Sequence, residues 1–142
     1  MRTVLIVLFL LIGFVSTVSA QEESLCGDLM TAPALPTDPT PAQTVAHSGL
    51  QLAATQDYAT AVTLFTQALS IDANYFEAYR QRGCAQLFAL NLNEAQADFD
   101  AYINATGDES IRPLVEELLA TYSNPDSSCV NGTAYTSQRE AR

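Results

Sequence analysis

Residues 74–105 read NYFEAYRQRGCAQLFALNLNEAQADFDAYINA, and this stretch decides the fold of the chain. Apolar residues recur at three- and four-residue spacings over 76–90 and again over 93–105, with a short polar break between the two parts. This spacing places the apolar side chains of each part on one face of an α-helix. The small residues Gly83 and Ala95 allow the two helices to approach closely. The stretch therefore predicts a helical hairpin.

The preceding stretch, 42–73, carries the same pattern, because a shift of 34 residues aligns the packing positions of the two copies. The aligned pairs are Val45 with Tyr79, Gly49 with Gly83, Tyr58 with Leu92, Ala61 with Ala95, Phe65 with Phe99 and Leu69 with Ile103. The agreement lies at packing positions and not at surface positions. Two-helix units repeated at such a period stack into arrays. The sequence therefore predicts an all-α fold.

These positions resemble the tetratricopeptide repeat family. The resemblance is carried by Gly49, Leu52, Tyr58, Ala61, Phe65 and Ala68 in the first copy, and by Tyr79, Gly83, Leu92, Ala95 and Phe99 in the second. It implies a short right-handed superhelix of two hairpins, about 42–73 and 74–107, whose first helices line a concave groove that binds peptides or partner surfaces. Tyr102 stands where the first copy has the small Ala68, so no ordinary third repeat is expected to follow.

A last helix is predicted over 110–122, after the second copy. Its apolar residues fall on one face, and they are Ile111, Leu114, Val115, Leu118, Leu119 and Tyr122. Repeat arrays need a terminal element that covers the last apolar face. We therefore expect a capping helix that closes a domain over 42–122, followed by a polar tail of low order over 123–142.

The first 20 residues have the composition of a signal peptide. Arg2 precedes an apolar run, and Val18-Ser19-Ala20 provides a small-residue cleavage site before Gln21. The alternative is an uncleaved membrane anchor, although the run is shorter than the roughly 20 apolar residues that span a bilayer. We expect a secreted or periplasmic protein with no stable membrane span after cleavage.

Residues 21–41 contain four prolines and predict an extended linker, whose early part can dock on the domain if Cys26 is tethered. Three cysteines after an export signal indicate disulfide chemistry, because exported proteins meet oxidising compartments. Cys26 and Cys129 lie in the two flanking segments, so the preferred disulfide is Cys26–Cys129. Cys84 lies within a predicted helix and is interpreted as an inert small hydrophobic residue.

The chain is strongly acidic, with sixteen acidic residues, six basic ones and a formal net charge of −10. Such a surface repels nucleic acid and anionic membranes. The expected partners are therefore proteins or peptides with basic or neutral surfaces, and a homodimer is a further candidate.

If the implied groove exists, its proposed binding residues are His47, Leu50, Glu77, Arg80, Gln81, Cys84, Leu87 and Phe88. Arg80 and His47 are the best polar anchors, because a guanidinium can hold a carboxylate with two hydrogen bonds. The alternative is that Arg80 pairs with Glu77 and that His47 is solvated. Arg82 is expected to form a structural ion pair with Asp98.

The sequence contains no nucleophile at a catalytic spacing from its one histidine, no phosphate-binding loop, no paired metal-ligand motif and no cofactor fingerprint. We therefore predict a protein without enzymatic activity, metal or cofactor, which acts as an interaction module by groove binding. Two alternatives stay open. One is a self-associating structural or scaffold protein. The other is a thiol redox protein that uses Cys84 with Cys26 or Cys129 as the resolving cysteine.

Overall fold

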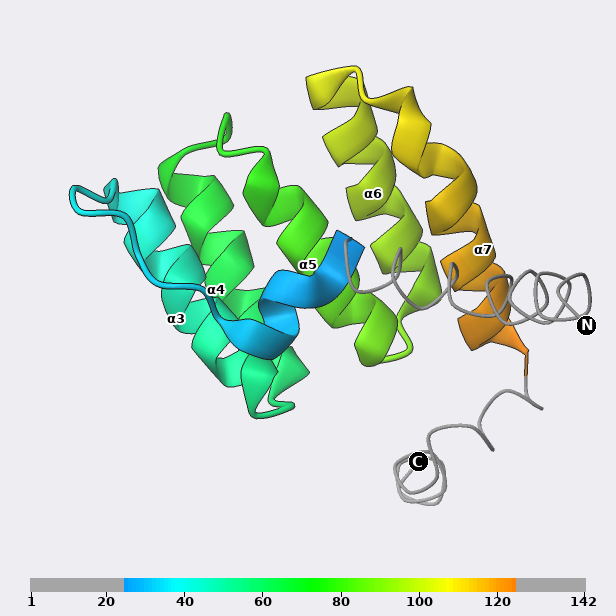
Figure 1. Cartoon of the computed structure of the whole chain (residues 1–142), viewed down its shortest axis with the longest axis horizontal. Helices are drawn as coiled ribbons and strands as arrows, with labels where there is room; N and C mark the ends of the chain where they lie inside the picture. The colour runs from blue at the N-terminus through cyan, green and yellow to red at the C-terminus, as the bar shows by residue number, and fades with distance from the viewer. Residues whose placement is uncertain (1–24, 125–142) are drawn as a thin grey trace, which may run out of the picture.

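A computed structural model describes residues 25–124 of the 142-residue chain, and this part is all-α. The helices are α3 (Pro41–Ala54), α4 (Tyr58–Ile71), α5 (Glu77–Phe88), α6 (Leu92–Thr106) and α7 (Arg112–Ser123), with a short 3₁₀ turn η1 (Glu109–Ile111) before α7. They follow one another across the molecule, and each packs against its neighbour (Figure 1). In addition, α3 contacts α5, so the first helices of the two hairpins are adjacent. The predicted fold class is confirmed.

The two hairpins match each other in their backbone as well as in their sequence. Each has a single residue with positive φ in its interhelical turn, Gln56 at 67° and Leu90 at 62°, and these positions are again 34 residues apart. A left-handed residue cannot continue a helix, which explains why α5 ends at Phe88 and not at 90 as the spacing predicted.

Inside each hairpin a glycine lies directly over a phenylalanine ring. A β-carbon added at Gly49 would lie 2.8 Å from a ring carbon of Phe65, and one added at Gly83 would lie 3.0 Å from the corresponding atom of Phe99. Both rings are fully buried. The absence of a side chain at the glycines therefore allows the close approach that the sequence predicted at Gly83.

The expected ion pair between Arg82 and Asp98 is present. Arg82 donates from Nε at 2.8 Å and from Nη2 at 2.6 Å to the two carboxylate oxygens of Asp98, whose side chain is only 7% exposed. The hydrogen bonds to Asp98 raise the pKa of Arg82. This pair joins the two helices of the second hairpin.

The last helix covers the end of the array. Val115 and Leu118 of α7 are buried in the common core, and Leu114 and Leu119 pack against it. Asp108 begins the turn η1 by accepting a hydrogen bond from the Ser110 amide, and the helix proper starts at Arg112. Within residues 25–124, no helix is long and apolar enough to cross a membrane.

The segment before α3 differs most from the prediction. Residues 25–31 are helical, whereas an extended linker was expected over 21–41. In Figure 1 this helical segment, drawn in blue, crosses α5. We call residues 25–31 the docked segment and residues 32–40, which connect it to α3, the strap. The proposed signal peptide at 1–20, Cys129 and the tail beyond Asn124 lie outside the described residues.

Candidate partner-binding face

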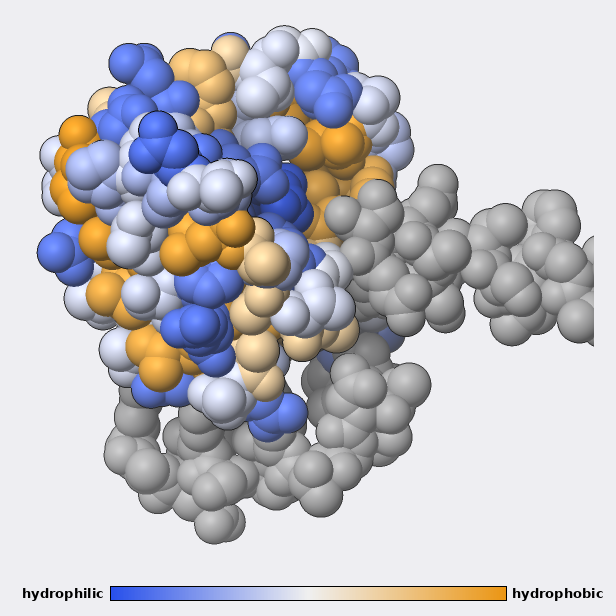
Figure 2. Space-filling view, turned by 60° about the vertical axis from the view of Figure 1, so that its left-hand side comes forward, coloured by the Kyte–Doolittle hydropathy of each residue, from blue (hydrophilic) through white to orange (hydrophobic). Residues whose placement is uncertain are grey.

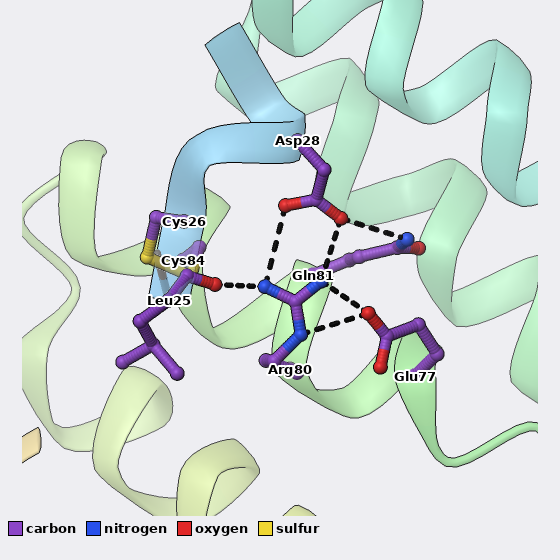
Figure 3. The surroundings of a disulfide bond; sticks show 7 residues. All are labelled: Leu25, Cys26, Asp28, Glu77, Arg80, Gln81 and Cys84. Atoms are coloured by element: carbon purple, nitrogen blue, oxygen red, sulfur yellow. Dashed lines mark hydrogen bonds and ion pairs between the residues drawn. A yellow bond between two sulfur atoms is a disulfide. The ribbon is translucent and has the colours of Figure 1, made fainter. Parts of the chain in front are cut away.

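One face of α5 presents four of the predicted groove residues. Glu77, Arg80, Gln81 and Cys84 are spaced by three, four and seven residues from the first, so their side chains share one side of the helix. The docked segment lies on this side (Figure 3). The structure therefore brings these four residues together and places a part of the same chain against them.

Arg80 is the centre of the contacts. Its Nη2 lies 2.7 Å from Asp28 Oδ2, its Nε donates to Glu77 Oε1 at 2.8 Å, and its Nη1 donates to the carbonyl oxygen of Leu25. The Arg80 side chain is 12% exposed and that of Asp28 is 15% exposed. The alternative interpretation is confirmed, because Arg80 pairs with Glu77. The second carboxylate is that of the chain's own Asp28, so a role of Arg80 as an anchor for a partner stays a prediction.

These contacts also keep the Arg80 side chain positively charged. Burial, the largest single influence, lowers its pKa, but the hydrogen bonds that Arg80 donates to Glu77 and Asp28, together with the charges of these carboxylates, raise the pKa above its ordinary value. Arg80 is therefore a permanent cation with two carboxylates around it. One carboxylate comes from its own helix and the other comes from the docked segment.

Gln81 extends the recognition of Asp28. Its Nε2 donates to Asp28 Oδ2 at 3.1 Å, and the residue is only 4% exposed. Asp28 thereby accepts hydrogen bonds from two neighbouring residues of α5. A guanidinium and an amide that both donate hydrogen bonds to a carboxylate fix its orientation, and the guanidinium also neutralises its charge.

The disulfide joins Cys26 to Cys84, with an S–S distance of 2.01 Å and 5.6 Å between the Cα atoms. The predicted Cys26–Cys129 disulfide is therefore wrong, and so is the interpretation of Cys84 as an unpaired hydrophobic residue. The reason is that the docked segment is a helix lying on α5, which brings the two sulfurs together. A sequence separation of 58 residues gave no sign of this proximity.

Apolar contacts complete the docking. Leu25, Cys26 and Leu29 are 5%, 1% and 1% exposed, and they belong to the same buried cluster as Leu50 and Leu87. Burying a leucine side chain stabilises by roughly 1.5–3 kcal/mol relative to exposing it. The docked segment is therefore part of the core and not a loosely attached end.

The remaining predicted residues lie at the edges of this face. His47 is partly exposed, and one of its ring nitrogens lies 3.1 Å from Nε2 of Gln51. Phe88 is half-buried between the rings of Tyr58 and Tyr122, at centroid distances of 5.4 and 6.0 Å. Neither side chain contacts the Arg80 network by a hydrogen bond.

A small cavity of about 120 Å³ remains between the strap and the helices. Its lining includes Pro33 and Pro36 of the strap, His47 and Leu50 of α3, and Gln81 of α5. It therefore lies beside the docked segment, where the strap passes over the first helices. Within the described residues, no group of three or more His, Cys, Asp or Glu side chains could hold a metal ion.

The sequence analysis expected the early part of the linker to dock if Cys26 is tethered, but it missed that this part is a helix and that Leu25, Asp28 and Leu29 occupy the face of α5. The signal that could have found them is their spacing, since Leu25 and Leu29 lie one helical turn apart with Asp28 beside them, and the first proline follows four residues later at Pro33. No family model, curated protein or solved structure matches this chain.

Proposed function

We propose that the chain is a non-enzymatic protein-interaction module, and that the face formed by α3 and α5 binds a short helical segment of a protein. The observation that supports this most directly is the docked segment itself. It is a helix whose apolar side chains are buried and whose carboxylate is bound by Arg80 and Gln81. Amphipathic helices are commonly recognised in this way.

The docked segment also indicates the chemistry of the ligand. It presents two leucines four residues apart, Leu25 and Leu29, with a carboxylate at Asp28 on the same side. A partner with two apolar side chains and one acidic side chain at this spacing would fit the same contacts. In the closed chain described here, the chain's own residues take that place.

The scaffold proposal rests on the repetition of the two hairpins. The shared 34-residue offset of their glycine–phenylalanine contacts and of their left-handed turn residues supports a tetratricopeptide-like array. A right-handed superhelix with the first helices lining the binding face is part of the same proposal. Export after cleavage of residues 1–20 is supported by their composition and by the Cys26–Cys84 disulfide, since disulfides persist in oxidising compartments.

The test uses an opened full-length chain. Cys26→Ser removes the disulfide, and Asp28→Arg in the same chain places a second cation against Arg80, so the chain's own segment should leave the face. The probe is a fluorescently labelled peptide of residues 22–32 with serine at position 26. Fluorescence anisotropy should show that this peptide binds the opened chain but not the oxidised wild type.

A matched control peptide carries Asp28→Arg and should bind the opened chain at least about tenfold more weakly, because charge-assisted hydrogen bonds contribute roughly 1.5–3 kcal/mol. Introducing Arg80→Glu into the opened chain should reverse this preference. If the opened chain keeps its helical circular dichroism spectrum and binds neither peptide, the proposed binding face is wrong.

The self-association alternative has weaker support than the proposed binding face. The large apolar side chains exposed in the described part are Met30, Ile71 and Leu90, and hydrophobic and hydrophilic areas alternate over the face seen in Figure 2. A mass that increases with concentration would favour it. The thiol redox alternative gains a pairing of Cys84 with Cys26, but both residues are buried, whereas the cysteines of thiol redox enzymes are accessible thiolates that react rapidly.

A further inference from the structure

We propose that the Cys26–Cys84 disulfide is a redox lock, which keeps the docked segment on the binding face when oxidised and allows it to leave when a dithiol reduces the bond. This inference rests on the proposed function, because it concerns the same face. It assigns a regulatory role to the one covalent link between the docked segment and α5.

The first argument is the position of the disulfide among the contacts. Cys26 lies between Leu25, whose carbonyl oxygen accepts from Arg80, and Asp28, whose carboxylate accepts from Arg80 and Gln81. The disulfide therefore crosses the middle of the surface that a ligand would need. While the bond exists, the segment cannot move away from α5, and no second helix can reach Arg80.

The second argument is that the strap, which connects the docked segment to α3, favours departure of the segment from α5. Ala32, the first residue of the strap, has a φ of 42°, in the left-handed region that is unfavourable for a residue with a β-carbon. The strained residue ends the docked helix, since the Ala32 amide donates to the carbonyl oxygen of Asp28 at 2.8 Å, and the strain is relieved where that helix unwinds as the segment leaves. The strap itself holds Pro33, Pro36 and Pro39, which keep it extended and stiff.

The third argument concerns what remains after reduction. The reduced segment is held by contacts that an incoming helix can reproduce, namely two buried leucines, the hydrogen bonds of Asp28 with Arg80 and Gln81, and the hydrogen bond from Arg80 to the Leu25 carbonyl oxygen. A partner segment that makes the same contacts can then compete, at a concentration high enough to match the effective concentration of the tethered segment. The disulfide is the single contact for which a partner without a cysteine has no equivalent.

The reaction balances with a dithiol as the co-reactant. One thiolate of the dithiol attacks a sulfur of the protein disulfide, forms a mixed disulfide and releases the other cysteine as a thiolate. The second thiol of the reagent then closes its own disulfide and releases the second cysteine. Two electrons and two protons pass to the protein, which gains two thiols. Because Cys26 and Cys84 are 1% and 0% exposed, attack requires that the segment first lifts locally, so reduction should be slow.

The experiment compares oxidised and dithiothreitol-reduced full-length chain by hydrogen exchange with mass spectrometry. After mass mapping has verified reduction, the amides of residues 27–31 should exchange at least tenfold faster, while the amides of α6 and α7 should keep their protection. Cys26→Ser should show the fast exchange without reductant, and Cys129→Ser should behave as the wild type does. The labelled peptide should bind the reduced chain and not the oxidised one.

Three results separate the possibilities. If the reduced chain keeps residues 27–31 protected within a factor of two, the lock is wrong, even when the opened chain binds the peptide. If protection is lost throughout α6 and α7, the disulfide maintains the whole fold, and the lock is also wrong. If the segment is released on reduction but the opened chain binds no peptide, release is supported and the proposed function fails.

Discussion

At the scale of single residues, two glycines pack closely against two phenylalanine rings. Gly49 and Gly83 lie over Phe65 and Phe99 at distances that leave no room for a methyl group. Both contacts lie inside a hairpin, where the rings are fully buried and cannot move into solvent. The small space over each phenylalanine ring therefore explains why positions 49 and 83 hold glycine.

We predict that Gly49→Ala destabilises the protein by about 1–3 kcal/mol. The added β-carbon would lie 2.8 Å from the Phe65 ring, and overpacking of a filled core has a cost of this size. The free energy of unfolding from urea denaturation measures the effect. Gly27→Ala is the matched control, because Gly27 is helical and no atom lies within 4 Å of a β-carbon added there.

The control should be neutral or stabilise by up to about 1 kcal/mol, since alanine is the better helix former. Equal effects of the two substitutions would show that close packing does not explain Gly49.

The residue scale also shows what the sequence could predict. The pair Arg82–Asp98 was predictable, because both residues lie within one hairpin whose register the repeat defines. The partner of Arg80 was only half predictable. Glu77 lies on the same helix, but Asp28 lies 52 residues away in a stretch that its prolines marked as linker. Its contact depends on tertiary docking, of which local periodicity gives no sign.

At the scale of elements, the turns inside the hairpins carry strain. Gln56 and Leu90 occupy the left-handed region, where a residue with a β-carbon is roughly 1–2 kcal/mol less stable than in the right-handed region. Both turns are followed at once by the next helix, α4 or α6. The strained residue is therefore the element that reverses the chain direction.

We predict that Gln56→Gly stabilises the protein by up to about 1 kcal/mol. Glycine adopts the left-handed conformation without the steric cost, although its freer unfolded chain offsets part of the gain. Gln56→Ala keeps the β-carbon and provides the control, with an expected change within about 0.5 kcal/mol. Thermal unfolding of both variants measures the difference, and a glycine variant less stable than the alanine variant would contradict the assignment of strain.

The elements themselves were largely predictable, and their borders were less so. Apolar spacing predicted both helices of the second hairpin to within two residues at each end. It did not predict the docked segment as a helix, because seven residues hold one helical repeat, that of Leu25 and Leu29, and a single repeat does not define a period. That helix exists because its apolar side chains are buried on α5.

At the scale of the whole molecule, the docked segment is a second element, besides α7, that covers apolar surface of the array. The capping helix α7 covers one end, and the docked segment covers the side of α5 that carries Arg80 and Cys84. A small array has a limited core, so each covering element contributes a large part of its stability. The disulfide adds a covalent link between the beginning of the described chain and its third long helix.

We predict that Cys26→Ser lowers the free energy of unfolding by about 2–4 kcal/mol under oxidising conditions. A cross-link between residues separated by 58 positions removes chain entropy from the unfolded state, and the value lies at or below the estimate for a loop of that length. Urea denaturation at equilibrium provides the measurement. Cys84→Ser should produce the same loss, because it breaks the same bond.

The comparison with Cys129→Ser separates the two pairings. If Cys26 is joined to Cys84, this variant keeps the bond between the docked segment and α5, and its stability should fall by less than about 1 kcal/mol. If Cys26 were joined to Cys129, the loss would match that of Cys26→Ser, and Cys84→Ser would have the smaller effect. Equal losses for Cys26→Ser and Cys84→Ser, with no comparable loss for Cys129→Ser, would therefore establish that the segment is fastened to its own binding face.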